Sequence, residues 1–459
     1  MLEFPLDRNS SPMAPHRPVS PDQKAAVGDK SKFQGNLLLW PVIRSARTFR
    51  VYVVEPKDYH PAVHKNIFNA AITALVTPEL TLIDAYAADE GISEVDPFDL
   101  ITFPEAFLPK DELLSALPKI SDLDSIGCVH VGLRPTKADP HLFSVQEIEG
   151  LVRSLRDIPR VNKSDLNAFS NWLRKQSGDK KFNIGCLFTI DADHQLRICL
   201  HPKLVRSKFE ASPLPEEHMA EADLLTLVTL LPSDKALLSV TLQPLLCSDV
   251  LHLDTDRPQC WPLEGVNTNA NCFGDSPPDH VDVVSIATCT PQQNESTPMG
   301  VQYRTWHQEY LDSFRRAASD PALPRHHYST FVLSNFQTFP GASAPYGLSG
   351  AFIPVPLRKA FPLFVKARSW GRFRDSDSSN RWSTPDDGAA TGKKWSSFGY
   401  VASLDSVALE GLAPAHMLGF TVHRLPRHTT HWRPAEGLVD FQLRTAMDDP
   451  ESGTMVFRK

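Results

Sequence analysis

The sequence lacks several features that would assign it to a familiar class of protein. It contains no run of 18 apolar residues that could span a membrane, and its first residues have no apolar centre like that of a signal peptide. Its seven cysteines form no CxxC pair, so neither a zinc ribbon nor a disulfide framework is indicated. The net charge of −7 provides no basic excess for nucleic acid. We therefore expect a cytoplasmic protein with free thiols that binds neither membrane nor nucleic acid.

Three common catalytic motifs are also missing. The chain has no GxSxG, no HExxH and no glycine-rich phosphate loop. Its 459 residues are 41% hydrophobic, which is enough to bury a large core. We expect a disordered leader over residues 1–34, one domain over 35–425 with insertions near 254–278 and 370–397, and a C-terminal tail over 426–459.

Within the expected domain, strand and helix patterns alternate. Phe143–Arg156 has apolar residues on one helical face, and Lys163–Lys175 is predicted to be a second helix. Gly132 is expected at a bend in the strand Cys128–Leu133. Residues 254–278, rich in Asn, Pro and Gly, are expected to be irregular. The predicted strands are Asn36–Ile43, Thr48–Val54, Leu100–Phe103, Cys128–Leu133, Phe182–Ile190, Gln195–Leu200, Leu224–Leu231, the run into Cys247, Val281–Cys289, Tyr328–Asn335, Ser349–Val355, Phe398–Val407 and Met417–Arg424.

The stretch Leu238–Val250 reads as an apolar strand that ends abruptly in Cys247. Pro244 indicates either an edge strand or the last pairing position of the strand. A thiol at the carboxyl end of a strand is well placed to act as a nucleophile. Taken alone, however, the signal is weak, because most cysteines at strand ends are small buried hydrophobic residues.

Glu105 also follows a strand, within the segment FPEAFLP. Its apolar neighbours would raise the pKa of the carboxyl by desolvation and make it a candidate general base. The alternative is a glutamate in the first turn of a helix after Pro104, facing water.

Lys203 lies in HPKLVRSKFE, directly after the second strand of an expected hairpin. A solvated loop cation is the ordinary explanation for such a lysine. A recurring pattern favours a functional role instead, because three strands each end in one chemically reactive residue, namely Glu105, Lys203 and Cys247.

These three residues, in this order, resemble the Glu–Lys–Cys triad of the nitrilase superfamily of carbon–nitrogen hydrolases. FPEAFLP is similar to the segment around the family's general base, and HPKLVRSKFE to the segment around its lysine. In LLCSDV, Asp249 matches the acid two positions after the nucleophile, and Glu210 falls where many members carry a second glutamate. The resemblance extends from about Asn36 to about Arg424.

The resemblance implies an α/β fold, specifically a four-layer α-β-β-α sandwich that pairs into a homodimer or larger homo-oligomer. It also implies hydrolysis of an amide, ureido or nitrile carbon–nitrogen bond through a thioester, with no metal and no cofactor. Cys247 would be the nucleophile, activated by a nearby ammonium that lowers its pKa, and Glu105 the general base. Lys203 and the backbone N–H of Ser248 would bind the oxyanion, with Glu210 orienting Lys203.

The chain departs from the family pattern close to the nucleophile. Ser248 stands where an aromatic residue is usual, and Pro202 where an arginine is usual. These departures leave the triad intact but put the substrate in doubt. Two alternatives to a hydrolase are an idle member that serves as a binding or regulatory subunit, against which the retained triad argues, and an N-acyltransferase. We expect the latter to carry membrane spans, which this sequence lacks.

Overall fold

The computed structural model describes residues 33–42, 48–56, 61–76, 99–136, 141–207, 210, 218–233, 239–251, 261–275, 277–290, 306–327, 329–336, 349–352, 415–424 and 432–434. The expected leader up to residue 32, the insertion at 370–397, the strand at 398–407 and all of the tail except Trp432–Pro434 lie outside these residues. Among the described helices, none is long and apolar enough to cross a membrane.

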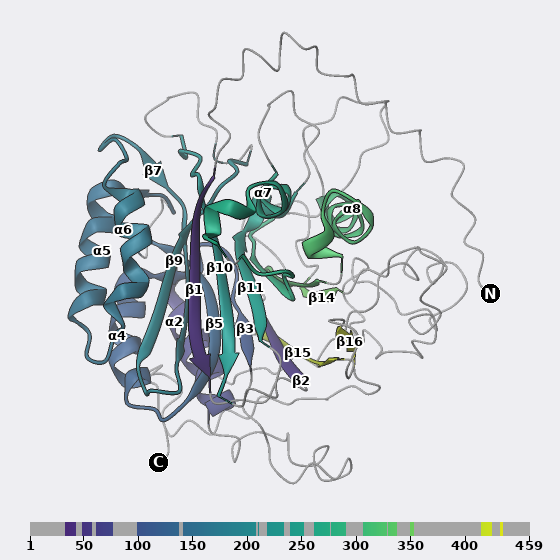
Figure 1. Ribbon diagram of the computed structural model, residues 1–459. Coiled ribbons are helices and arrows are strands. Elements are labelled where there is room, and N and C mark those ends of the chain that lie inside the picture. Colours follow the sequence, from purple (N-terminus) through teal and green to yellow (C-terminus); the bar gives the residue numbers. More distant parts are fainter. Residues whose placement is uncertain are drawn as a thin grey trace, which may run out of the picture.

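The described strands form two large mixed sheets (Figure 1). The first has the order β1 (Gln34–Val42), β10 (Leu224–Pro232), β11 (Val240–Leu246), β12 (Val283–Ala287), β13 (Thr330–Ser334) and β14 (Gly350–Phe352). The second has the order β16 (Trp432–Pro434), β15 (Ala415–Arg424), β2 (Thr48–Pro56), β3 (Leu100–Thr102), β5 (Ile126–Arg134), β8 (Ile184–Ile190) and β9 (Leu196–Pro202), with β4 (Leu108–Pro109) also paired to β5. A small third sheet pairs β6 (Phe143–Ser144) with β7 (Lys181–Phe182).

The two large sheets pack against each other through buried polar side chains. Ser285 of β12 bonds to both His130 of β5 and Thr102 of β3, at 2.7 and 2.8 Å. Ser334 of β13 donates to the carbonyl of Val54 in β2 at 2.6 Å. Every residue of β5, β8 and β9 is buried, as expected for strands that are covered on both faces. The mixed α/β architecture predicted from the sequence is therefore present.

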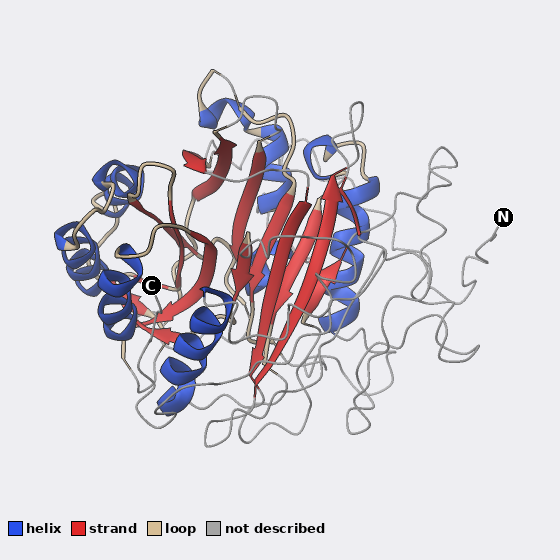
Figure 2. Ribbon diagram, turned by 90° about the horizontal axis from the view of Figure 1, so that it is seen from below, coloured by secondary structure: helices blue, strands red, loops and turns tan. Residues whose placement is uncertain are grey.

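Helices flank the sheets on either side (Figure 2). α2 and α4 contact β4 of the second sheet, whereas α7 contacts β10 of the first. The helices are α2 (Pro61–Val76), α4 (Lys110–Ser121), α5 (Val145–Asp157), α6 (Asn167–Leu173), α7 (Pro262–Thr268) and α8 (Trp306–Ser319). Short 3-10 turns are η2 (Lys163–Leu166), η5 (Cys247–Val250), η6 (Ala270–Phe273) and η7 (Pro324–His326).

The amphipathic helix predicted at Phe143–Arg156 is α5, and its sequence explains its start. Ser144 accepts the backbone N–H of Glu147 at 3.3 Å, and the Glu147 carboxylate accepts the backbone N–H of Ser144 at 2.8 Å. This reciprocal capping box satisfies donors that a helix start otherwise leaves unpaired. Its predicted apolar face is buried as expected.

Three details of the sequence prediction are wrong, and one of two alternatives is excluded. Gly132 lies inside β5 and not at a bend: a Cβ there would come within 2.5 Å of the Cα of Glu105, so glycine permits a close approach. The helix predicted at Lys163–Lys175 is split into η2 and α6. Residues 254–278 include α7 and η6, so the described part of this region is not irregular. Of the two explanations offered for Pro244, the edge strand is excluded, because β11 lies between β10 and β12.

Pro244 is nevertheless placed where a missing N–H is tolerated. The pairing of β11 with β10 ends at Leu242, whereas its pairing with β12 continues to Leu246. The proline therefore lies beyond the last antiparallel pair on one side of the strand. β11 then continues to Cys247, which carries the candidate nucleophile.

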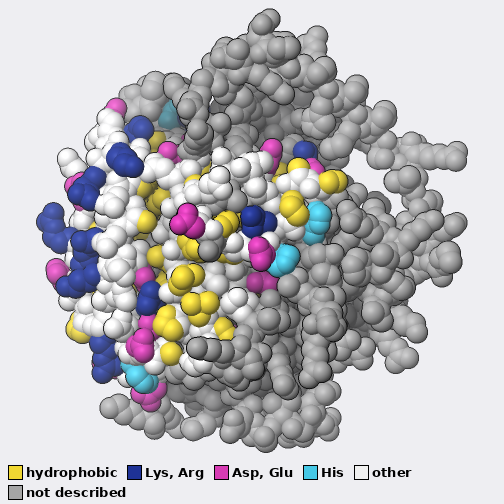
Figure 3. All heavy atoms as spheres, in the orientation of Figure 1, with side chains coloured by type: hydrophobic (Ala, Val, Ile, Leu, Met, Phe, Trp, Pro, Cys, Tyr) yellow, Lys and Arg dark blue, Asp and Glu magenta, His cyan; other side chains and the backbone are white. Residues whose placement is uncertain are grey.

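One face of the molecule carries exposed apolar side chains of the first sheet. Leu39 of β1 is 53% exposed and Leu231 of β10 is 36% exposed. Figure 3 shows hydrophobic side chains over the central part of this face and Lys and Arg side chains toward the edge where α5 and α6 lie.

Candidate active site

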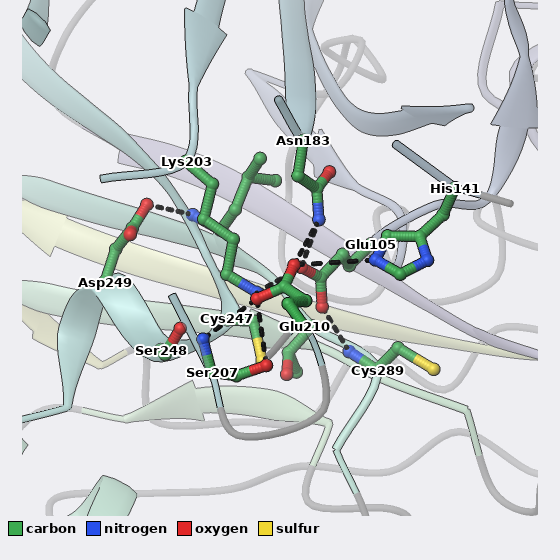
Figure 4. Close-up of polar contacts among 12 residues, drawn as sticks. Glu105, His141, Asn183, Lys203, Ser207, Glu210, Cys247, Ser248, Asp249 and Cys289 are labelled. Atoms are coloured by element: carbon green, nitrogen blue, oxygen red, sulfur yellow. Dashed lines mark hydrogen bonds and ion pairs between the residues drawn. The ribbon is translucent and has the colours of Figure 1, made fainter. Parts of the chain in front are cut away.

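The structure brings Glu105, Lys203 and Cys247 together from three strand ends (Figure 4). Glu105 follows β3, Lys203 follows β9, and Cys247 begins η5 directly after β11. Each is no more than 5% exposed. The explanation of Lys203 as a solvated loop cation and of Glu105 as a water-facing residue in a helix turn is therefore wrong.

Lys203 is held between two carboxylates. Its Nζ lies 2.7 Å from Oε1 of Glu105 and 2.7 Å from Oε2 of Glu210. Burial by itself would lower the pKa of this ammonium. The negative charges of Cys247, when ionised, and of both glutamates outweigh it and raise the pKa well above its usual value. Lys203 is therefore a permanently charged, fixed donor at neutral pH.

Glu105 is fixed through both carboxylate oxygens. Oε1 accepts from Lys203 and from Nδ2 of Asn183 at 2.8 Å, and Oε2 accepts the backbone N–H of Cys289 at 3.2 Å. Its backbone N–H donates to the carbonyl of Thr288 at 3.3 Å, which links the residue to the opposite sheet. The turn is tight, since Ala106 adopts a positive φ of 50°.

Glu210 completes the set on the other side of the ammonium. Asn183 donates to its Oε1 at 3.0 Å, and the backbone N–H and hydroxyl of Ser207 donate to its Oε2 at 2.9 and 2.8 Å. Burial alone would raise the pKa of this carboxyl. The charge of Lys203 and the contact with His141 lower it by a larger amount, so that the net pKa lies well below its usual range. Glu210 therefore remains ionised beside Lys203.

Cys247 occupies a strained turn. Its φ of 45° lies in the left-handed region, which residues other than glycine rarely adopt. Such strain is retained where the surrounding contacts enforce it, and it projects the thiol at the end of β11 toward the charged groups. Figure 4 shows the sulfur on the side of Lys203, and the next residue, Ser248, is buried with its hydroxyl 2.5 Å from the carbonyl of Val205.

Asp249 explains how the turn is enforced. One carboxylate oxygen accepts the backbone N–H groups of Leu204 and Val205 at 2.8 and 2.7 Å, and the other accepts that of Leu246 at 3.0 Å. The side chain is fully buried, and burial raises its pKa to about 7. It thereby joins the segment that carries Lys203 to the segment that carries Cys247.

The expectation that Lys203 lowers the pKa of the thiol is met only in part. Burial and the negative charge of Glu105 raise the pKa of Cys247, Lys203 lowers it, and Glu210 raises it again. The net pKa is raised, because burial and two carboxylates outweigh one ammonium. The resting nucleophile is therefore a thiol whose proton must be removed during the reaction.

Among the site residues that were not predicted from the sequence are Asn183, His141 and Cys289. Asn183 is fully buried and bridges both glutamates, while Nε2 of His141 lies 3.5 Å from Oε1 of Glu210. Each is a single polar residue with no distinctive spacing. Only the position of Asn183 at the start of a buried strand gave any signal.

Other features lie apart from this cluster. A hollow of about 510 Å³ is lined by Asp124, Arg160, Val161, Asp193, His194 and Gln195, at the end of β9 opposite to Lys203. Among the described residues, no group of three or more His, Cys, Asp or Glu side chains is arranged to hold a metal ion. The six described cysteines are all free thiols.

Comparison with known proteins adds little to this geometry. No family model matches the chain, and no curated protein matches it in sequence. Among solved structures, the crystal structure of an N-terminal amidase is similar over 66% of this chain and 90% of that chain, with 10% identity and a TM-score of 0.34. A TM-score this low supports no argument about fold or activity.

Proposed function

We propose that this protein is a cysteine-dependent hydrolase of a non-peptide carbon–nitrogen bond in a small amide, ureido compound or nitrile. The observation that carries the proposal is the buried ammonium of Lys203, held at 2.7 Å from each of two carboxylates beside the thiol of Cys247. Three ionised groups are costly to bury and here surround a nucleophile at the end of a strand. We further propose a four-layer α-β-β-α architecture of the nitrilase type.

For an amide, the reaction begins with transfer of the Cys247 proton to Glu105. The sulfur attacks the carbonyl carbon, and the developing oxyanion is stabilised by Lys203 and by the backbone N–H of Ser248. Collapse of the tetrahedral intermediate breaks the C–N bond, and the leaving amine takes the proton from Glu105. The product of this half-reaction is a thioester on Cys247.

Water completes the turnover. Glu105 removes a proton from the water that attacks the thioester, and the C–S bond breaks to release the carboxylic acid. The thiolate regains the proton and the resting thiol is restored. Glu210 and Asn183 act by holding Lys203 and Glu105 in place through both half-reactions.

The test is release of ammonia or amine from a panel of amides, ureido compounds and nitriles. We expect release from at least one compound by the wild-type protein, and a loss of about 1,000-fold or more in Cys247→Ser. Cys272→Ser, which changes a half-buried thiol on η6, serves as the matched control and should retain the wild-type rate.

Intact-mass spectrometry during turnover provides a second measurement. It should detect an acyl adduct that maps to Cys247 and disappears when the substrate is exhausted. If a folded wild-type protein releases nothing from any compound and acquires no adduct, the hydrolase proposal is wrong and a non-catalytic role in binding is favoured.

A further inference from the structure

The sulfur of Cys247 is surrounded by hydroxyl groups as well as by charges. Oγ1 of Thr290 lies 3.0 Å from the sulfur, and the phenol oxygen of Tyr310 lies 3.6 Å from it. Thr290 follows β12 of the first sheet, whereas Tyr310 projects from α8. Two separate elements therefore direct a hydroxyl at the candidate nucleophile.

A third hydroxyl closes these two into a ring. Thr288 lies 2.6 Å from Thr290 and 2.9 Å from Tyr310, and Thr290 lies 3.1 Å from Tyr310. All three side chains are at most 3% exposed. Such a buried cluster is favourable only when every hydroxyl has a partner, which this closed arrangement provides.

The ring can serve two states of the sulfur without movement of any heavy atom. When Cys247 is a thiol, each hydroxyl can donate to the next around the ring and the S–H can donate into it. When Cys247 is a thiolate, rotation of two O–H bonds directs Thr290 and Tyr310 at the sulfur. Thr288 then donates to one of them, so no hydroxyl proton is left without an acceptor.

The backbone around Thr290 is held firmly in this position. The side chain of Asn335 accepts the backbone N–H of Thr290 at 3.2 Å and donates to its carbonyl at 2.9 Å. Two residues earlier, Thr288 donates its backbone N–H to Ser334 at 2.9 Å. Donors fixed in this way need no reorganisation when negative charge develops on the sulfur.

A need for such donors follows from the other groups that face the thiol. Burial, Glu105 and Glu210 raise its pKa, whereas Lys203 and the hydroxyl of Thr288, a member of the ring, lower it. Burial and the same carboxylates raise the pKa of Cys289, the neighbouring thiol, well above its usual value, so Cys289 stays neutral and adds no charge of its own. Hydrogen bonds to the ionised form act in the opposite direction to burial.

We propose that Thr290 and Tyr310 are further catalytic residues that donate hydrogen bonds to the Cys247 thiolate, with Thr288 as a positioning residue that orients them. The role rests on the hydrolase function proposed above. In that reaction the same two donors stabilise the thiolate as it attacks the substrate and again as it leaves the thioester.

The test measures how fast iodoacetamide alkylates Cys247 as a function of pH, read from the mass of the Cys247 peptide. Tyr310→Phe and Thr290→Val each remove one donor with little change in shape. A hydrogen bond to a charged group corresponds to a shift of about one pH unit, so we expect each midpoint to rise by about that amount. At pH 7 the rate should fall about tenfold, and the rates should converge at high pH.

Three variants control for structural effects. Tyr52→Phe removes a buried phenol on β2, and Thr226→Val removes a buried hydroxyl on β10 that has no partner among the described residues. Both should alkylate like the wild type. Thr290→Ser keeps the hydroxyl donor, so its midpoint should lie close to that of the wild type. The comparison of Thr290→Ser with Thr290→Val therefore tests the inference even if Tyr310→Phe does not fold.

The result that overturns the inference is a set of midpoints that coincide, with Thr290→Val indistinguishable from Thr290→Ser. This outcome is separate from failure of the proposed function, because alkylation requires no substrate. Shifted midpoints without ammonia release would retain the hydroxyl donors and reject the hydrolase. Ammonia release with unshifted midpoints would support the hydrolase and reject the hydroxyl donors.

Discussion

At the scale of single residues, the most informative group is Glu210, because it contacts Lys203 without being one of the three strand-end residues. Replacement by glutamine keeps the shape but removes the charge opposite the ammonium. We expect the free energy of unfolding to fall by about 1–3 kcal/mol, since a charge-assisted bond between buried groups is lost. Urea denaturation measures this, with Glu149→Gln on the exposed face of α5 as the control.

The same variant separates support from chemistry. Lys203 keeps its contact with Glu105 in Glu210→Gln, so alkylation of Cys247 should remain measurable while the rate of the proposed reaction falls about 10- to 100-fold. A variant that matches the wild type in both stability and rate would show that Glu210 does not position Lys203.

Asp249 offers a second prediction at this scale. An asparagine has one acceptor oxygen, so its NH₂ group must face a backbone N–H on one side of the turn, either at Leu246 or at Leu204 and Val205. We expect Asp249→Asn to lose about 1–3 kcal/mol of stability and to slow alkylation of Cys247, because the strained φ of that residue is no longer enforced. Unchanged stability would contradict this role.

Site residues could be predicted from the sequence where a chemically reactive side chain follows the end of a predicted strand. Glu105, Lys203 and Cys247 share that property and lie together in the structure. The hydroxyl ring was not readable, because Thr288 and Tyr310 are ordinary residues of a strand end and a helix, 22 positions apart in the chain. Nor was the raised pKa of Cys247, which depends on burial by elements distant in sequence.

At the scale of elements, the close passage of β5 beneath Glu105 sets the geometry of the site. A Cβ on Gly132 would lie 2.5 Å from the Cα of Glu105 and 2.6 Å from the backbone nitrogen of Ala106. Gly132→Ala must therefore displace this turn, although every charged group is retained. We expect loss of about 1–3 kcal/mol of stability and of most activity.

Gly150 provides the matched comparison. It lies in α5, where an added Cβ would meet nothing within 4 Å. Gly150→Ala should raise the free energy of unfolding by about 0.5–1 kcal/mol, because alanine is the better helix former. Thermal unfolding and ammonia release of the two variants check the prediction. Equal behaviour would show that the approach of β5 does not constrain Glu105.

Elements were predictable where local pattern and tertiary packing agree. The hairpin of β8 and β9 was expected from turn residues between two apolar runs. α7 was missed because Pro262–Thr268 is short and contains Gly and Asn, which favour helix weakly. Burial of Leu263 and Val266, which no local pattern reveals, stabilises it.

At the scale of the whole molecule, three buried histidines are kept neutral by their surroundings. Nε2 of His130 in β5 lies 3.0 Å from Nε2 of His201 in β9, so a single proton joins two rings of the second sheet, and Nδ1 of His130 contacts Ser285 of the first sheet. His326 contacts Asn267 through Nδ1 and Gln243 through Nε2, at 3.0 and 2.8 Å. All three rings are at most 2% exposed.

These rings make the fold sensitive to acid. Burial lowers the pKa of His201 and of His326 to about 3 and that of His130 well below its usual value, so the unfolded chain takes up protons first as the pH falls below about 6.5. Their contribution to stability is complete above pH 6.5 and is lost toward pH 3. Asp249 acts in the opposite direction, because burial raises its pKa to about 7 and the folded state holds that proton.

Near pH 5, because of these four groups, the unfolded state binds about two protons more than the folded state. The free energy of unfolding should therefore fall by about 2–3 kcal/mol for each unit by which the pH decreases. Urea denaturation at pH 7.5, 6 and 5 measures the slope. His326→Gln should reduce it by about one proton, because glutamine keeps a polar group facing Gln243 and Asn267 but does not titrate. Asp249→Asn should steepen it, since the opposing carboxyl is gone. A wild-type stability that does not change between pH 7.5 and 5 would show that the three rings are accessible to protons in the folded protein.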